Sequence, residues 1–276
     1  MTTQGPHDRL SHDLQRLLEP DPGVLALTLF GSATRPDRDA WSDLDALIVL
    51  TDDALARYHP SLAWLAPLGA VFAHDHSTGV YSATTRVCFD DFRRLDVVFT
   101  PETSLARLDA WPSIPFWAGC TVLFSRLPQI TEMLTRRFAP PEVRPLSAEQ
   151  MDAMVEQFWF KSALTVVKVV RGDLLIALHL ALDLVRDCCV LKMLLRDRAE
   201  GTNHHRHGGI GNPFVLALDT MRTPYTAHGI LDGVAHSAFL FDTLAAEFMA
   251  GYVPRRGPLL AALTSARRSL TDTPSA

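Results

Sequence analysis

Two short apolar runs near the start of the chain, each joined to a short polar motif, constrain the fold more than any other feature. The first run, residues 25–30, ends at Gly31-Ser32. After a gap, Asp43-Leu44-Asp45 leads into the second run, residues 46–50. Both runs are brief, rich in leucine or β-branched residues, and bounded by turn residues, which is typical of buried strands. The polar motifs are therefore predicted to lie at strand ends.

Asp43 and Asp45 are predicted to point to the same side, because alternate residues of an extended strand share a face. Leu44 then points into the core. Two carboxylates this close repel each other unless a cation lies between them, and Mg²⁺ favours one or two protein carboxylates together with substrate phosphates. Gly31 lets the backbone approach a phosphate, and the Ser32 hydroxyl can bind phosphate oxygens. The motifs predict a site for Mg²⁺ and for a ligand that carries phosphate.

A third carboxylate, Asp96, stands inside a later strand pattern at residues 94–99, and residues 81–89 are predicted to form the neighbouring strand. Alone, a Gly-Ser pair occurs by chance and an Asp-x-Asp motif usually belongs to a solvated turn or a cap. In their strand contexts, the three motifs together resemble the signature of the polymerase-β-like nucleotidyltransferase superfamily. The resemblance implies that Asp96 is the third carboxylate of that site.

The chain changes character at the proline-rich residues 140–145. Short strands and polar turns precede this point, and helical periodicity follows it. We therefore expect an α+β protein, with a mixed-sheet nucleotidyltransferase domain over residues 1–140 and an all-α helical, substrate-binding domain over residues 146–270. The elements expected in the first domain are a helix at 7–18 and strands at 24–30, 43–50, about 69–74, 81–89 and 94–99.

The second domain is predicted to open with a helix capped by Ser147, with Gln150 at the spacing of a capping box. Lys161 and Lys168 lie on one polar stripe of this otherwise apolar helix. Two lysines so placed could meet the β and γ phosphates of a nucleotide and offset the charge on pyrophosphate. The alternative is a solvent-facing edge whose lysines reach into water.

The next helix, from Leu174 to about Arg196, also carries polar residues on one side. These residues are His179, Asp183, Arg186 and Asp187. Charged groups among apolar neighbours need a partner or a ligand. Either they contact the substrate, or Asp183 and Arg186 form an internal ion pair, and the sequence leaves both open.

Residues 157–196 are similar to the helical domain of antibiotic nucleotidyltransferases of the aminoglycoside 6-adenylyltransferase and lincosamide nucleotidyltransferase kind. The resemblance implies Mg²⁺-dependent transfer of a nucleoside monophosphate, most often AMP from ATP, to a hydroxyl of a small antibiotic, which causes resistance. It implies that Asp43 and Asp45 bind metal and that Asp96 is a catalytic base or a third ligand. Relatives of this kind often form homodimers. Several have Glu at the third position, where this chain has the shorter Asp96.

Composition limits the other classes of partner. A net charge of -5 does not support binding to nucleic acid, which normally needs a basic face. The first nine residues are polar, and no apolar run is long enough to cross a membrane, so a cytoplasmic protein is expected. The four cysteines show no spacing of metal ligands and are expected to be thiols.

Polar segments outside these motifs favour weaker hypotheses. Arg35 and Arg38 could touch the triphosphate but are more simply surface charges. The segment 201–212 holds His204, His205 and His207, which raises the alternative of a zinc-dependent hydrolase. A short loop seldom supplies enough ligands to close a zinc tetrahedron, so a glycine-rich loop over the substrate or a plain surface loop is preferred.

Two further alternatives keep the same fold. The chain could bind a nucleotide without turnover, as a regulatory protein, because fold does not determine function. The presence of three candidate carboxylates favours an enzyme. It could also transfer AMP to a protein side chain, which would need an open acceptor cleft instead of a small polar pocket.

Overall fold

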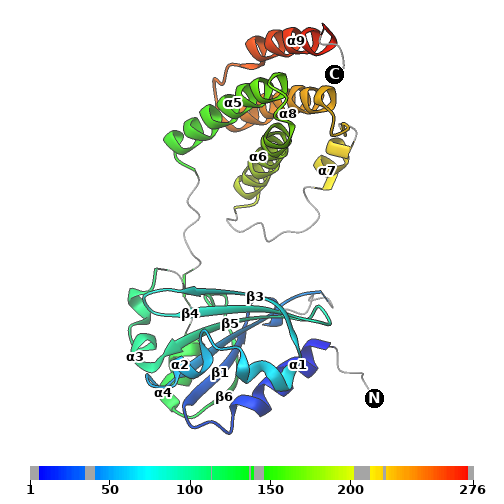
Figure 1. Cartoon of the computed structure of the whole chain (residues 1–276). Helices are drawn as coiled ribbons and strands as arrows, with labels where there is room; N and C mark the ends of the chain where they lie inside the picture. Colours follow the sequence, from blue (N-terminus) through cyan, green and yellow to red (C-terminus); the bar gives the residue numbers. More distant parts are fainter. Residues whose placement is uncertain are drawn as a thin grey trace. The chain divides into compact units, whose positions relative to one another are not determined.

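The computed structural model describes residues 6–34, 41–112, 114–136, 138–139, 146–201, 212–219 and 222–272. The chain divides into two compact units, Met1–Glu142 and Val143–Ala276. The first unit combines a sheet with short helices, and the second is helical (Figure 1). The predicted α+β fold class is confirmed.

The first unit is built on a six-stranded sheet in the order β3-β4-β5-β2-β1-β6. Its strands are β1 (Val24–Phe30), β2 (Leu44–Leu50), β3 (Val71–Thr78), β4 (Ala83–Phe89), β5 (Arg94–Pro101) and β6 (Thr121–Ser125). Strands β2 and β5 pair in parallel, and the other pairings between the described strands are antiparallel. The sheet is therefore mixed, as predicted.

Helices cover both faces of this sheet because its central strands are apolar on both sides. On one face, Leu10 and Leu14 of α1 (Pro6–Leu18) join a core that includes Leu44. On the other face, Ile130 and Leu134 of α4 (Pro128–Thr135) join a core that includes Leu47. The remaining short helices of the unit are η1 (Gly31–Thr34), α2 (Leu55–Tyr58), η2 (Ala63–Leu68), α3 (Glu102–Leu105) and η3 (Leu108–Ala110). Double-sided burial explains the continuous apolar runs of β1 and β2.

The expected strands exist, with bounds that differ in places. Strand β3 was expected at about 69–74 but runs to Thr78, through His74 and Asp75. Most residues of this edge strand are exposed, so no apolar alternation marks its second half. Strand β6 and helix α4 were not predicted, because β6 offers only three apolar residues between Thr121 and Ser125.

The second unit consists of α5 (Ala148–Val170), α6 (Leu174–Glu200), α7 (Asn212–Asp219), α8 (Ala227–Phe248) and α9 (Arg256–Asp272). The capping box predicted for α5 is present. The backbone N–H of Gln150 donates to Ser147 Oγ at 3.1 Å, and the backbone N–H of Ser147 donates to Gln150 Oε1 at 2.9 Å. In the core, Phe158 of α5 stacks on Phe241 of α8, with ring centroids 3.7 Å apart. This contact joins two of the long helices.

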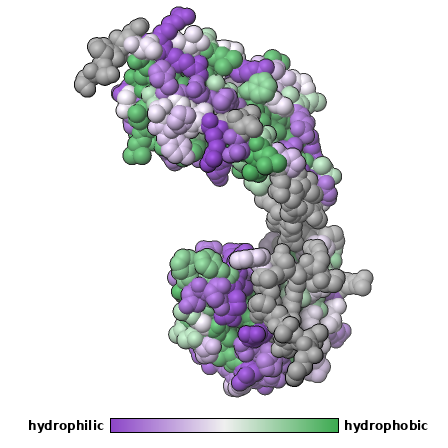
Figure 2. All heavy atoms as spheres, turned by 90° about the vertical axis from the view of Figure 1, so that its right-hand side faces the viewer, coloured by the Kyte–Doolittle hydropathy of each residue, from purple (hydrophilic) through white to green (hydrophobic). Residues whose placement is uncertain are grey.

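Hydrophilic and hydrophobic residues are interspersed on the face drawn in Figure 2. Within the part of the chain that the structure describes, no helix has both the length and the apolar character needed to span a bilayer.

Asp242 on α8 anchors the segment that leads into α9. Its side chain is only 1% exposed. Oδ1 accepts hydrogen bonds from the Tyr252 hydroxyl at 2.8 Å and the Arg255 amide at 3.0 Å. Oδ2 accepts from Nη1 of Arg256 at 3.1 Å. Removal of a buried carboxylate that accepts several hydrogen bonds is strongly destabilising, because its donors lose their acceptor.

We predict that Asp242→Ala lowers the free energy of unfolding by about 2–4 kcal/mol, because it leaves the partly exposed Arg256 guanidinium and two further donors without their acceptor. Urea denaturation followed by circular dichroism measures the change. The control Asp219→Ala removes a carboxylate whose side chain is 70% exposed and should change stability by less than about 0.5 kcal/mol. Equal effects of the two substitutions would contradict the prediction.

Candidate active site

The parallel pairing of β2 with β5 brings the three predicted carboxylates together. Asp45 and Asp96 are direct register partners in this pair. Asp43 precedes β2 by one residue and lies two residues before Asp45, while the intervening Leu44 is fully buried. One carboxylate oxygen from each aspartate lies within 4.8 Å of the others. The alternation predicted from the sequence therefore yields one carboxylate cluster, which we call the triad (Asp43, Asp45 and Asp96).

Gly31 leaves the space that the Asp45 side chain occupies. A Cβ atom added to Gly31 would lie 2.1 Å from Oδ2 of Asp45. The backbone also has φ of +64° there, a conformation that favours glycine. The sequence predicted a glycine that approaches phosphate, and the structure adds a second reason for it. The turn after β1 and the carboxylate on β2 have to be packed together.

Ser32 ties the same turn to the start of β2. Its hydroxyl donates a hydrogen bond to the backbone carbonyl of Asp43 at 3.0 Å. Gly31 and Ser32 thus fix the positions of Asp45 and Asp43 respectively. The predicted contact of Ser32 with a phosphate stays a prediction.

Among the residues that the structure describes, two arginines pair with the triad, and the sequence predicted neither. Nη2 of Arg94 lies 2.9 Å from Oδ2 of Asp43, and Nε of Arg86 lies 3.3 Å from Oδ2 of Asp96. The signal was present in strand geometry, since Arg94 is two residues before Asp96 on β5 and Arg86 is the register partner of Asp96 on β4.

Burial raises the pKa of Asp96, and the nearby negative charge of Asp43 raises it further. The positive charges of Arg94 and Arg86 oppose this rise without cancelling it. A carboxylate with a raised pKa is a stronger base than an ordinary aspartate. The site therefore combines a charged cluster with a carboxylate suited to accept a proton.

Comparison with known proteins identifies the family. The model of the streptomycin adenylyltransferase family matches residues 11–202, a stretch that contains every predicted site residue. The chain belongs to the streptomycin adenylyltransferase family. It is a nucleotidyltransferase, as the motifs predicted.

Among solved structures, an aminoglycoside 6-adenyltransferase from Bacillus subtilis resembles this adenylyltransferase family member over 97% of this chain and 98% of the other, at 13% identity and a TM-score of 0.38. No curated protein matches this chain.

The triad of this family member fits a hard divalent cation. Its three carboxylates offer oxygen ligands within 4.8 Å of one another, and oxygen is the donor that Mg²⁺ prefers. Within the described ranges, it is the one group of three His, Cys, Asp or Glu side chains close enough to share a metal ion. The missing Cβ of Gly31 keeps Asp45 in that group.

The other predicted site residues lie in the helical unit, and several pair with one another. Lys161 Nζ lies 3.2 Å from Oδ2 of Asp183 and 2.7 Å from Oδ2 of Asp187. Lys168 Nζ lies 3.0 Å from Oδ2 of Asp173. Both lysines, predicted to bind nucleotide, thus have carboxylate partners within their own unit.

The alternative of an ion pair between Asp183 and Arg186 is wrong, because each of these residues has another partner. Asp183 pairs with Lys161 of α5, because the packing of α5 on α6 brings that ammonium to it. Arg186 has Asp187 at 3.9 Å instead, with a side chain that is 71% exposed. The proposed ligand roles of these residues, and of the exposed His179, stay predictions.

Some predicted features lie outside the described residues. These are Arg35, Arg38, the histidines of the segment 201–212, and the whole proline-rich boundary at 140–145.

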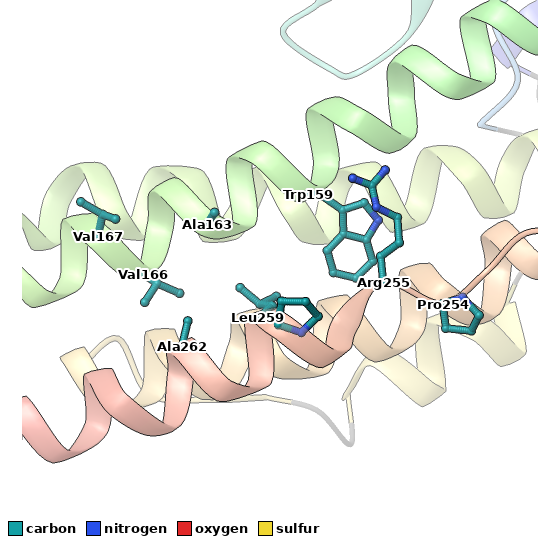
Figure 3. A pocket seen from close by; sticks show the side chains of 9 residues that line it. Trp159, Ala163, Val166, Val167, Pro254, Arg255, Leu259 and Ala262 are labelled. Atoms are coloured by element: carbon teal, nitrogen blue, oxygen red, sulfur yellow. The ribbon is translucent and has the colours of Figure 1, made fainter.

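A separate apolar groove of about 590 Å³ lies within the helical unit (Figure 3). Trp159 and Val166 of α5 face Leu259 and Ala262 of α9 across it, with Arg255 at one end. None of the predicted site residues lines this groove. Its apolar lining suits neither a nucleotide nor a polar acceptor, so it is distinct from the chemistry of the triad.

We predict that Gly31→Ala lowers the rate of nucleotidyl transfer by at least about 100-fold, because the new methyl group displaces Asp45. The measurement is pyrophosphate release at saturating nucleotide and acceptor. Gly251→Ala is the matched control: Gly251 has φ of +79°, but nothing lies within 4 Å of its added Cβ. It should cost stability, about 1–2 kcal/mol, and leave the rate unchanged. An active Gly31→Ala enzyme would show that Asp45 tolerates displacement.

Proposed function

We propose that the protein transfers AMP from Mg²⁺-bound ATP to a hydroxyl group of an aminoglycoside antibiotic and so inactivates the drug. The observation that carries this proposal is the triad on β2 and β5, packed against the Gly31-Ser32 turn. Family membership supports the reaction class, and the family description names streptomycin. A lincosamide is the second acceptor class that the sequence resemblance suggests, and the assay below separates the two.

The proposed reaction is an in-line displacement at the α-phosphorus of ATP. The acceptor oxygen forms the new P–O bond, the bond to pyrophosphate breaks, and the hydroxyl proton leaves. The chemistry that Mg²⁺ supplies when bound is neutralisation of phosphate charge and a lowered pKa of the hydroxyl. Asp43 and Asp45 would hold the metal, and Ser32 and the amides of its turn would hold phosphate oxygens.

Asp96 is proposed to accept the proton of the acceptor hydroxyl. Its side chain is 18% exposed, and burial raises its pKa, which increases its basicity. Its register pairing with Asp45 puts it beside a metal ligand, so it can also serve as the third ligand.

We propose that residues of the helical unit help to bind the nucleotide and the acceptor. Lys161 already has two carboxylate neighbours, so it would have to exchange them for phosphate oxygens to bind a nucleotide. Lys168 would likewise have to leave its single carboxylate partner. For the acceptor, Asp183 and Asp187 hold the ammonium of Lys161 at 2.7–3.2 Å. An amino group of a cationic antibiotic could be held in the same way, with His179 and Arg186 nearby on α6.

The first test is incubation of the purified protein with Mg²⁺, ATP and a panel of aminoglycosides and lincosamides. We predict pyrophosphate release and a mass gain of one AMP on an aminoglycoside, streptomycin being the first to test. Transfer of AMP to a lincosamide but to no aminoglycoside would support the proposed reaction and change the proposed acceptor class. Tight nucleotide binding without transfer to any panel member would favour a protein acceptor or a regulatory nucleotide-binding protein.

We predict that Asp43→Asn or Asp45→Asn lowers transfer by more than about 100-fold, because loss of a metal-binding carboxylate removes several kcal/mol of transition-state stabilisation. Circular dichroism should show an intact fold in both variants. Asp90→Asn is the control, since Asp90 is exposed in the turn between β4 and β5. Turnover retained in either triad variant would overturn the assignment of the metal ligands.

A further inference from the structure

The triad gathers three negative charges, and arginines offset part of that charge. Arg94 donates from Nη2 to Oδ2 of Asp43 at 2.9 Å. Its charge also acts on Asp96, whose pKa it lowers in opposition to burial and to Asp43. Arg94 therefore acts on two members of the triad, by a direct ion pair with Asp43 and by its charge near Asp96.

Arg86 and Arg94 are held differently. Arg86 lies between Asp96, at 3.3 Å, and Asp75 on β3, at 3.2 Å, so it has a second carboxylate to retain it. Arg94 is the first residue of β5, its side chain is 50% exposed, and its ion pair in the described structure is with Asp43. Of the two, Arg94 is the arginine that can leave the triad at small cost.

We propose that Arg94 is an exchangeable counter-ion: it neutralises Asp43 in the nucleotide-free protein and transfers to the triphosphate when Asp43 binds the metal ion. This inference rests on the proposed function. A divalent cation on Asp43 repels the guanidinium, so metal alone has to displace Arg94 at a cost. A nucleotide supplies phosphate oxygens that can accept the same guanidinium in bidentate fashion. Metal and nucleotide therefore bind with positive coupling.

The test measures Mn²⁺ binding, so it does not depend on activity. Free Mn²⁺ is followed by electron paramagnetic resonance, with and without α,β-methylene-ATP, whose bridging carbon prevents transfer. In Arg94→Gln, Mn²⁺ alone should bind roughly three- to tenfold more tightly than in the wild type, because its competitor is gone. The nucleotide analogue should then strengthen Mn²⁺ binding less in Arg94→Gln than in the wild type.

Two further variants separate charge from side-chain loss. Arg94→Lys keeps the cation and should bind Mn²⁺ alone within about twofold of the wild type. Arg136→Gln removes an arginine of matched exposure, 51%, whose ion-pair partner is Asp109, and should also leave Mn²⁺ affinity unchanged. Circular dichroism and urea denaturation check that each variant is folded.

The outcomes distinguish this inference from the proposed function. If Asp43→Asn weakens Mn²⁺ binding while Arg94→Gln leaves it equal to or weaker than in the wild type, the counter-ion role is overturned and the metal site stands. If the nucleotide analogue strengthens Mn²⁺ binding equally in Arg94→Gln and the wild type, the counter-ion role is also overturned. If Asp43→Asn does not weaken Mn²⁺ binding, the proposed metal site and the role of Arg94 both fail.

Discussion

The parallel pairing of β2 with β5 is the constraint on which the rest of the site depends. It places Asp45 beside Asp96 in register, and the pleat then places Asp43 on the same side. Because side chains alternate along a strand, a slip by one residue would turn Asp96 toward the core and an apolar side chain toward Asp45. The apolar faces of both strands, buried in separate cores, oppose such a slip. The position of the carboxylates is thus determined by the hydrophobic packing beneath them.

The sequence predicted the parts of the site whose signal is local. Asp43 and Asp45 stand at the start of one apolar run, and Gly31 and Ser32 stand at the end of another, so strand periodicity alone predicted the carboxylate edge. Arg94 and Arg86 were missed because an arginine near a strand end looks like an ordinary surface charge until the partner strand is known. The space that Gly31 leaves for Asp45 likewise depends on a contact between two strands, which no local pattern records.

In the helical unit too, a local pattern was predicted correctly and a contact between two elements was not. The capping box of α5 is a local pattern and was predicted correctly. The polar stripes of α5 and α6 were also recognised, but each was considered by itself. The structure shows that the two stripes meet, because Lys161 of α5 lies between Asp183 and Asp187 of α6. Which polar residues satisfy one another is decided by helix packing, and periodicity along one helix does not contain that information.

The topology of the sheet also sets an order of events during synthesis. Asp43 and Asp45 leave the ribosome on β2 long before Asp96, because η2, β3 and β4 are made first. Strand β1 can pair with β2 early, as its direct antiparallel neighbour, but the opposite edge of β2 waits for β5. That edge is apolar on both faces and open to pairing with other chains while it waits. A nascent chain that stops before β5 therefore lacks a complete carboxylate site and exposes an unpaired edge of β2.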